Sequence, residues 1–192
     1  MVDSTDAVLA FLAAALLAWA TVPLAERFAI RVGAIDEPGP RSQHKVPTPR
    51  MSGLAILAGI EIAGWIWLPG NSETIAILLG AVAVTIVGAL DDIFDLPAMV
   101  KLLGQIVAAT IPVAAGVRPD VLTLPFIGGF DLGWTAYPLT VIGIVAVVNI
   151  VNLMDGIDGL AAGVVAIAAS AMAIIALSLD RYEAAVLAAV TA

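Results

Sequence analysis

The amino-acid sequence predicts an all-α polytopic membrane protein, and three observations carry this prediction. The 192-residue chain is 61% hydrophobic, and its mean hydropathy is +1.07. Only 12% of its residues are charged, against about one quarter in an average soluble domain. The apolar residues also fall into long runs, several of which approach the roughly 20 residues that a helix needs to cross a bilayer.

Six of these runs predict six transmembrane helices. The second run is interrupted by Glu61, and the other five contain no charged residue. The runs cover residues 7–25, 51–68, 74–90, 102–117, 132–154 and 159–179. A seventh apolar run begins at Ala184 and stops at Ala192, and nine residues are too few for a membrane-spanning helix. We therefore expect residues 1–192 to form a single transmembrane domain, an incomplete N-terminal portion of a longer protein.

The basic residues predict the orientation, because Lys and Arg accumulate in cytoplasmic loops. With the N-terminus outside, the loops at 26–50, 91–101 and 152–158 are all cytoplasmic. Six of the eight basic residues then lie inside, and only Arg118 and Arg181 lie outside. The opposite orientation would place six basic residues outside. We therefore expect a multi-pass protein of the cell inner (plasma) membrane with its N-terminus outside.

The sequences of two loops indicate their conformation. The predicted outer segment 118–133 holds two short extended pieces around Gly128 and Gly129, which favours a small external β-hairpin as much as an irregular loop. The predicted cytoplasmic loop 36–50 contains four prolines, which keep it extended. Arg41, His44, Lys45 and Arg50 lie along it and could meet phosphate oxygens. Taken on charge alone, they are better explained as basic anchors on the cytoplasmic side.

A first polar cluster, Asp91-Asp92-x-x-Asp95, follows the third apolar run. Acidic residues beside lipid are costly and usually functional. On a continuing helix, Asp91 and Asp95 would share one face, and their repulsion calls for a cation such as a divalent metal or Lys101. Pro97 suits the first turn of the next helix. A solvated turn without function is the alternative.

A second polar cluster lies at the end of the fifth run and on the same predicted face. Asn149, Asn152, Asp155 and Asp158 recur every three residues. On a regular helix they would spread over half of the surface, whereas a 3₁₀ stretch or a break at Gly156 and Gly159 would align them. Their amide and carboxylate oxygens suit Mg²⁺, which keeps waters for substrate phosphates. The chain has no cysteine, which excludes disulfides and thiolate metal sites.

These motifs together resemble the polyprenyl-phosphate N-acetylhexosamine-1-phosphate transferases, glycosyltransferase family 4. The resemblance covers roughly residues 24–163, and the form Pro47-x-Pro49-Arg50 is closer to the branch that uses UDP-N-acetylglucosamine. Ser52 departs mildly from the family's usual glycine. The three matching motifs are Asp36-x-Pro38-x-x-Arg41-x-x-His44-x-x-Pro47-x-Pro49-Arg50-x-x-Gly53, Gly88-x-x-Asp91-Asp92-x-x-Asp95-Leu96 with Lys101-Leu102 and Gln105, and Asn149-x-x-Asn152-Leu153-x-Asp155-Gly156-x-Asp158-Gly159-Leu160.

The resemblance implies transfer of N-acetylhexosamine-1-phosphate, expected to be GlcNAc-1-phosphate, from a UDP-sugar to a polyprenyl phosphate at the cytoplasmic face. UMP would leave, and cell-envelope polysaccharide assembly would begin. The implied catalytic residues are Asp91 and Asp92, and Asn152 is the implied ligand of Mg²⁺, which Mn²⁺ could replace. The implied substrate-binding residues are Lys101 at the diphosphate, Asp155 and Asp158 at the nucleoside, and Arg41, His44 and Arg50 in the first loop.

The partners expected from this reaction are a UDP-N-acetylhexosamine, a polyprenyl phosphate and the lipid bilayer. No nucleic acid is expected, and a homodimer is compatible with the sequence. Family members are roughly twice as long, and their later loops supply a further metal-binding Asp and a basic His/Arg loop. The chain ending at Ala192 is therefore expected to be inactive alone. Two alternatives stay open, namely a truncated, non-catalytic membrane scaffold and an ion-coupled transporter using Glu61.

Overall fold

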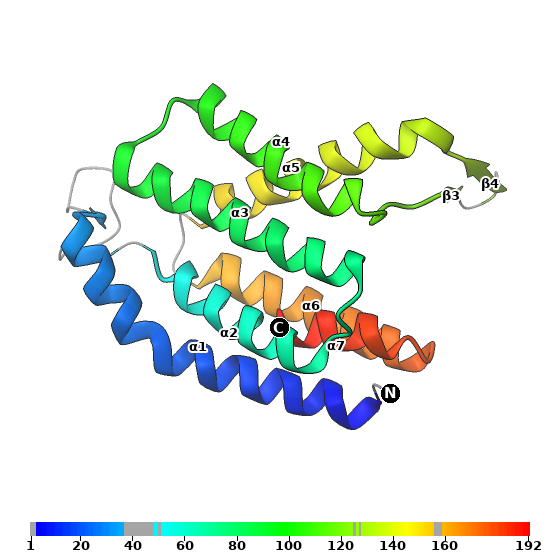
Figure 1. Ribbon diagram of the computed structural model, residues 1–192, viewed down its shortest axis with the longest axis horizontal. Coiled ribbons are helices and arrows are strands. Elements are labelled where there is room, and N and C mark those ends of the chain that lie inside the picture. Colours follow the sequence, from blue (N-terminus) through cyan, green and yellow to red (C-terminus); the bar gives the residue numbers. More distant parts are fainter. Residues whose placement is uncertain (1–2, 37–47, 50, 125, 127, 156–158) are drawn as a thin grey trace.

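The computed structural model is mostly helical and describes residues 3–36, 48–49, 51–124, 126, 128–155 and 159–192. Seven α-helices follow one another along this part of the chain, with two short two-stranded sheets between them (Figure 1). The helices are α1 Ser4–Val32, α2 Gly53–Trp67, α3 Ser72–Phe94, α4 Ala98–Ala114, α5 Ala136–Met154, α6 Leu160–Ser178 and α7 Tyr182–Val190. Each of the six predicted apolar runs therefore forms a helix.

Four of these helices are long and apolar enough to cross a membrane: α1, α3, α5 and α6. Helices α2 and α4 are apolar but shorter, with 15 and 17 residues. At 1.5 Å per residue they reach only about 22 Å and 25 Å, less than the roughly 30 Å of bilayer hydrocarbon. The structure thus supports a polytopic membrane protein with four candidate spans, and the predicted six crossings stay a prediction. Helix α7 has nine residues, as expected for a run too short to cross a bilayer.

Helix α1 is longer than the apolar run that predicted it. Its capping box at Asp3 and Asp6 starts the helix, because the two side chains bond each other's backbone N–H groups. The helix then continues through Glu26, Arg27 and Arg31 and ends at Gly33, whose φ of 78° is left-handed. The predicted cytoplasmic loop therefore begins later than residue 26. The helix extends beyond the apolar run because adding a residue to an existing helix costs less than starting a new one, and polar residues can be added in this way.

Small residues let the helices approach closely. A Cβ atom built at Gly59 of α2 would lie 2.4 Å from the Ala14 carbonyl oxygen of α1. Alanines also dominate the buried cluster that joins α1, α2, α6 and α7. Small side chains are typical of interfaces between membrane helices, where close backbone approach supplies the packing energy. The alanine-rich sequence thus acts as a set of packing surfaces, as expected.

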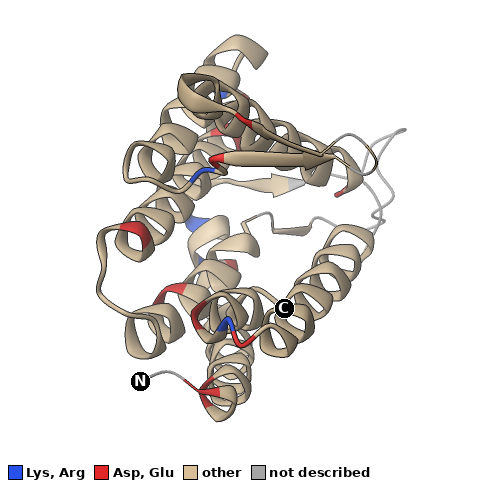
Figure 2. Cartoon of the chain, turned by 90° about the vertical axis from the view of Figure 1, so that its right-hand side faces the viewer, with Lys and Arg blue, Asp and Glu red and all other residues tan. Residues whose placement is uncertain are grey.

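The helix ends that flank the three polar segments lie on one side of the molecule (Figure 1). The C-terminal ends of α1, α3 and α5 and the N-terminal ends of α2, α4 and α6 are at the left of the view, and the opposite ends of these helices are at the right. This alternation agrees with the predicted crossings. Viewed from the right-hand end, the chain is mostly free of charge, and its Lys, Arg, Asp and Glu residues occupy a few short segments (Figure 2).

Two small sheets lie at opposite ends of the helices. Strand β1 (Ile35–Asp36) pairs antiparallel with β2 (Thr48–Pro49), which brings together the two ends of the loop after α1. Strand β3 (Val121–Leu124) pairs antiparallel with β4 (Gly128–Asp131) in the connection from α4 to α5. Of the two forms that the sequence left open for this segment, a hairpin and an irregular loop, the structure shows the hairpin. Its glycine pair lies within β4, and not at the turn between the strands.

Candidate functional site

Three candidate residues meet where α3 ends, α4 begins and α5 ends. The Lys101 Nζ atom donates to Asp91 Oδ2 at 2.7 Å and to Asn152 Oδ1 at 2.8 Å. Asn152 is 51 positions from Lys101 in the sequence, so the fold creates this contact. The Asp91 and Lys101 side chains keep about a quarter of their surface exposed. One ammonium group therefore joins an acidic and an amide oxygen from two other helices at a site open to solvent.

The turn between α3 and α4 positions Asp91. Helix α3 ends at Phe94, and Asp95 adopts a left-handed conformation with φ 49°, which Asp tolerates better than most residues. The chain then folds back, and the Leu96 N–H donates to Asp91 Oδ1 at 3.2 Å. The expectation that Asp91 and Asp95 share one helix face is wrong, because the helix ends before Asp95. Pro97 caps α4 directly before its first residue, Ala98.

Close packing one turn further along α4 brings Lys101 to Asp91. A Cβ atom built at Gly104 would lie 2.8 Å from a methyl carbon of Val87 on α3. Val87 precedes Asp91 by four residues and Gly104 follows Lys101 by three, so each pair lies on one helix face. The missing side chain at Gly104 allows the two helices to approach closely. The ion pair between Asp91 and Lys101 depends on this approach.

A pair of amides joins α4 to α5 one turn away from Lys101 and Asn152. Asn149 Nδ2 donates to Gln105 Oε1 at 2.7 Å and also to the Val145 carbonyl oxygen at 2.8 Å. The Gln105 side chain is 3% exposed and is the buried polar residue among those the structure describes. A buried amide without a partner would be costly, so this bond specifies how α4 and α5 align. The sequence motifs contained both residues, but only the structure assigns them this positioning role.

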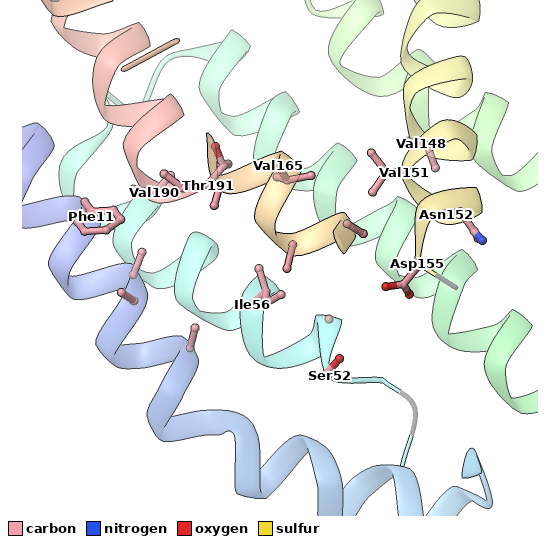
Figure 3. A pocket seen from close by; sticks show the side chains of 18 residues that line it. Phe11, Ser52, Ile56, Val148, Val151, Asn152, Asp155, Val165, Val190 and Thr191 are labelled. Carbon is pink, nitrogen blue, oxygen red and sulfur yellow. The ribbon is translucent and has the colours of Figure 1, made fainter. Parts of the chain in front are cut away.

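Asp155 faces a different part of the molecule. It caps α5 and lines a cavity of about 560 Å³ between α1, α2, α5, α6 and the end of the chain. Figure 3 shows its carboxylate directed to the cavity side of α5, whereas the Asn152 amide points to the other side. Apart from Ser52, Asn152, Asp155 and Thr191, the cavity lining is apolar. The site therefore has a charged part at Lys101 and a largely apolar part beside Asp155.

The structure gives less information on the other predicted site residues. Asp92 is half-buried beside Asp91 on α3. Arg41, His44, Arg50 and Asp158 lie outside the described residues. Helix α5 is regular through Met154, so the expected 3₁₀ alignment of the polar residues is not found there. The break expected at Gly156 falls outside the described part, and Gly159 beyond it has a left-handed φ of 75°.

The donor chemistry of the site fits Mg²⁺. The Asp91, Asn152 and Asp155 side chains offer oxygen ligands, and Asp91 and Asn152 already converge on one cation, the Lys101 ammonium. Within the described ranges, no group of three His, Cys, Asp or Glu residues could form a metal cage. Mg²⁺ does not need one, since it is commonly held by one or two protein ligands with waters and substrate phosphates. The Asn152 side-chain oxygen is therefore a suitable ligand for Mg²⁺.

Comparison with known proteins identifies relatives over most of the chain. A family model described as glycosyl transferase family 4 matches residues 74–192. The chain is 43% identical over 174 residues, 89% of its length, to a "Probable undecaprenyl-phosphate N-acetylglucosaminyl 1-phosphate transferase" of Bacillus subtilis. It is 38% identical over 126 residues, 61% of its length, to a "Decaprenyl-phosphate N-acetylglucosaminephosphotransferase" of Mycobacterium tuberculosis. A "Phospho-N-acetylmuramoyl-pentapeptide-transferase" of Desulforamulus reducens is 36% identical over 202 residues, 94% of the chain.

The chain spans only part of the length of these relatives. It covers 48% of the Bacillus protein, 31% of the Mycobacterium protein and 60% of the Desulforamulus protein. The matched region contains the helices that carry Asp91, Lys101 and Asn152. Since the family model matches more than half of the sequence, the chain belongs to glycosyl transferase family 4.

Proposed function

We propose that the full-length protein transfers N-acetylhexosamine-1-phosphate from a UDP-sugar to a polyprenyl phosphate and releases UMP. The sugar is proposed to be N-acetylglucosamine, which the names of the Bacillus and Mycobacterium relatives include. The observation that carries the proposal is the Lys101 ammonium held between Asp91 and Asn152. A cation held at the end of apolar helices suits a phosphate on a membrane lipid.

The proposed reaction brings two anions together. An oxygen of the lipid phosphate attacks the β-phosphorus of the UDP-sugar, and a new P–O bond forms. The bond from the β-phosphorus to the bridging oxygen breaks, and UMP leaves with that oxygen. Preorganised positive charge is the main requirement of such a step. Lys101 can supply it as a point charge, because an ammonium group binds phosphate readily.

Asp91 has two tasks in this proposal. Its carboxylate holds Lys101 through Oδ2 and accepts the Leu96 N–H at Oδ1. It can therefore orient Lys101 toward the diphosphate before the reaction. When the lipid phosphate arrives at Lys101, the same carboxylate can orient it or accept its proton, and Asp92 lies beside it. Mg²⁺ bound at Asn152 would neutralise charge that develops on the phosphate oxygens.

The nucleoside and sugar contacts complete the proposal. Asp155 and Asp158 are proposed to shape the nucleoside pocket, with Asp158 nearest the uracil. Arg41, His44 and Arg50 are proposed to contact substrate phosphate. The β1–β2 pairing supports this assignment of the first loop, because it fixes both ends of the loop at the same end of the helices as Asp91. The reaction would begin cell-envelope polysaccharide assembly.

Two other functions are weaker. An ion-coupled transporter would depend on Glu61, whose Oε2 accepts the Trp65 indole N–H at 3.1 Å and whose buried Oε1 has no partner in the part of the chain that the structure describes. A transporter would need further side chains to bind the ion, because Glu61 alone offers too few ligands. A non-catalytic membrane scaffold would keep the fold without turnover. Family membership favours the transferase over both.

The activity is tested with purified full-length protein, UDP-N-acetylglucosamine, polyprenyl phosphate and Mg²⁺. We expect release of UMP together with a lipid product that carries both the sugar and a diphosphate. UDP-N-acetylgalactosamine and the UDP-MurNAc-pentapeptide serve as alternative donors that identify the sugar. Tight substrate binding without any UMP release would favour the scaffold instead.

The membrane orientation is also a proposal, with the N-terminus outside and the site in the cytoplasm of the inner membrane. Residues 1–192 contain no cysteine, so single-cysteine labelling in intact cells is possible once any cysteine elsewhere in the full-length protein is replaced. A membrane-impermeant thiol reagent should label cysteines placed at Asp120 and Arg181. It should leave cysteines at Arg41, Asp91 and Asp158 unmodified until the membrane is permeabilised. Labelling at Arg41 but not at Asp120 would reverse the orientation.

A further inference from the structure

The β3–β4 hairpin has one apolar face and one more polar face. In its register, Leu122 pairs with Phe130, and Thr123 pairs with Gly129. Because side chains alternate across a strand, Leu122, Leu124 and Phe130 lie on one face. The other face carries Val121, Thr123, Gly129 and Asp131. A Cβ atom built at Gly129 would contact both Val121 and Thr123, which agrees with this assignment.

Described residues cover the apolar face only in part, because Leu122 and Leu124 keep 40% and 39% of their surface exposed. All eight residues of the two strands are exposed, and Phe130 keeps 47% of its surface accessible. A two-stranded hairpin without packing is marginally stable in water. Exposed apolar surface of this kind normally meets a partner. The hairpin therefore needs an apolar environment that the described part of the chain does not provide.

The surroundings of the hairpin indicate which environment this is. The hairpin lies at the end of α4 and α5, and η1 (Gly133–Thr135) connects it directly to the membrane-length α5 (Figure 1). Trp134 between them is 78% exposed, and Tyr137 on the first turn of α5 is exposed as well. Trp and Tyr concentrate where membrane helices leave the hydrocarbon. The hairpin thus adjoins an exposed aromatic pair at the start of a helix long enough to cross a membrane.

Polar groups set the depth at which the hairpin can lie. The outer edges of a two-stranded hairpin carry unpaired backbone groups, which cannot enter hydrocarbon. Asp131 accepts the Gly133 N–H at 2.9 Å, and the exposed Asp120 lies 4.0 Å from the Arg118 guanidinium. The Arg118 guanidinium in turn lies 4.3 Å above the Tyr137 ring. This combination of charged, aromatic and apolar groups matches the headgroup layer.

We propose that the β3–β4 hairpin is an interfacial anchor whose Leu122, Leu124 and Phe130 face lies in the headgroup layer of the bilayer. Its Thr123 and Asp131 face turns to water. The anchor fixes the hairpin ends of α4 and α5 relative to the membrane plane. Lys101 lies near the opposite end of α4, and Asn152 near the opposite end of α5, so the anchor helps set the height of the catalytic cluster.

Residues 1–192 contain no cysteine, so single spin labels give a direct test once any cysteine elsewhere in the full-length protein is replaced. Leu122→Cys, Thr123→Cys and Leu124→Cys variants of the full-length protein are labelled and reconstituted in phosphatidylcholine vesicles. Collision with oxygen, which is enriched in lipid, is compared with collision with a water-soluble nickel chelate. We expect the oxygen-to-nickel ratio to be several-fold higher at 122 and 124 than at 123. Thr123→Cys is the matched control, because it lies between the other two on the same strand.

Three results would overturn the anchor. Equal access of the nickel chelate to all three labels would mean that the hairpin projects into water. Shielding of the labels from both reagents would mean that protein covers the face, and spin–spin broadening that disappears on dilution with unlabelled protein would identify a second copy. A third result, a higher ratio at 123 than at its neighbours, would reverse the faces. UMP release is measured separately, so failure of the anchor leaves the proposed reaction untouched.

Discussion

Replacing Asp91 with Asn should remove most of the transferase activity of the full-length protein while leaving UDP-sugar binding intact. An amide nearly preserves the shape of the carboxylate, so the fold should survive. It loses the negative charge that faces the Lys101 ammonium at 2.7 Å, and it cannot accept a proton from the lipid phosphate. Loss of a general base typically costs about 10²–10⁴-fold in rate. UMP release and nucleotide binding are measured separately.

The size of the loss distinguishes the two tasks assigned to Asp91. The lipid phosphate is largely ionised near neutral pH, so a residue that only orients Lys101 would give a loss near the lower end of this range. Asp120→Asn makes the same chemical change at an exposed position in the connection between α4 and β3, and should keep wild-type turnover. Wild-type turnover in Asp91→Asn would remove the assigned role. Loss of binding together with turnover would move Asp91 into the nucleotide or metal site.

Removing divalent metal should abolish turnover in the full-length protein, and Mg²⁺ or Mn²⁺ should restore it. The ligands at the site are oxygen atoms and the chain has no thiol, which favours these hard cations over softer metals. The phosphates that react carry charge that one lysine only partly neutralises. Activity is followed in excess chelator and then during titration with each metal. Full activity in excess chelator would reject the metal requirement.

Asn152→Ala should raise the Mg²⁺ concentration needed for half-maximal activity and lower the maximal rate. Changing a residue that merely supports a metal ligand costs about 10–100-fold, and a direct ligand should cost at least as much. The change also leaves Lys101 with Asp91 alone. Ile150→Ala on the same helix is the control, because its side chain is exposed and lies away from the polar contacts. An unchanged Mg²⁺ titration in Asn152→Ala would place the metal elsewhere.

Local features of the sequence were sufficient to predict the helices, and they offered the hairpin as one of two forms for the segment after α4. Apolar runs identify helices because each must bury or present to lipid a continuous nonpolar surface. The short extended pieces around Gly128 predicted β3 and β4 for a similar local reason. The run lengths did not predict where helices end, since α1 continues past Arg31 while α3 stops before Asp95. Helix ends depend on caps and backbone conformation, which hydropathy does not report.

The grouping of the polar segments at one end also follows from the sequence, because helices that cross in turn alternate their ends. The sequence does not predict which side chains contact one another at that end of the helices. Lys101 was expected near phosphate, but the structure alone shows that it meets both Asp91 and Asn152. A regular α5 turns Asp155 away from Lys101 toward the cavity, because residues three apart on a helix differ in direction by about 60°.

The composition, the order of the motifs and the spacing along each helix establish a membrane protein of this family and the residues that can carry its chemistry. The packing of one helix on another decides which of them meet. Gly104 lets α4 approach α3 at Val87, and the buried Gln105 aligns α4 with α5 through Asn149. These contacts join residues that are distant in sequence and depend on side-chain shape across an interface. Periodicity within a single helix cannot reveal them.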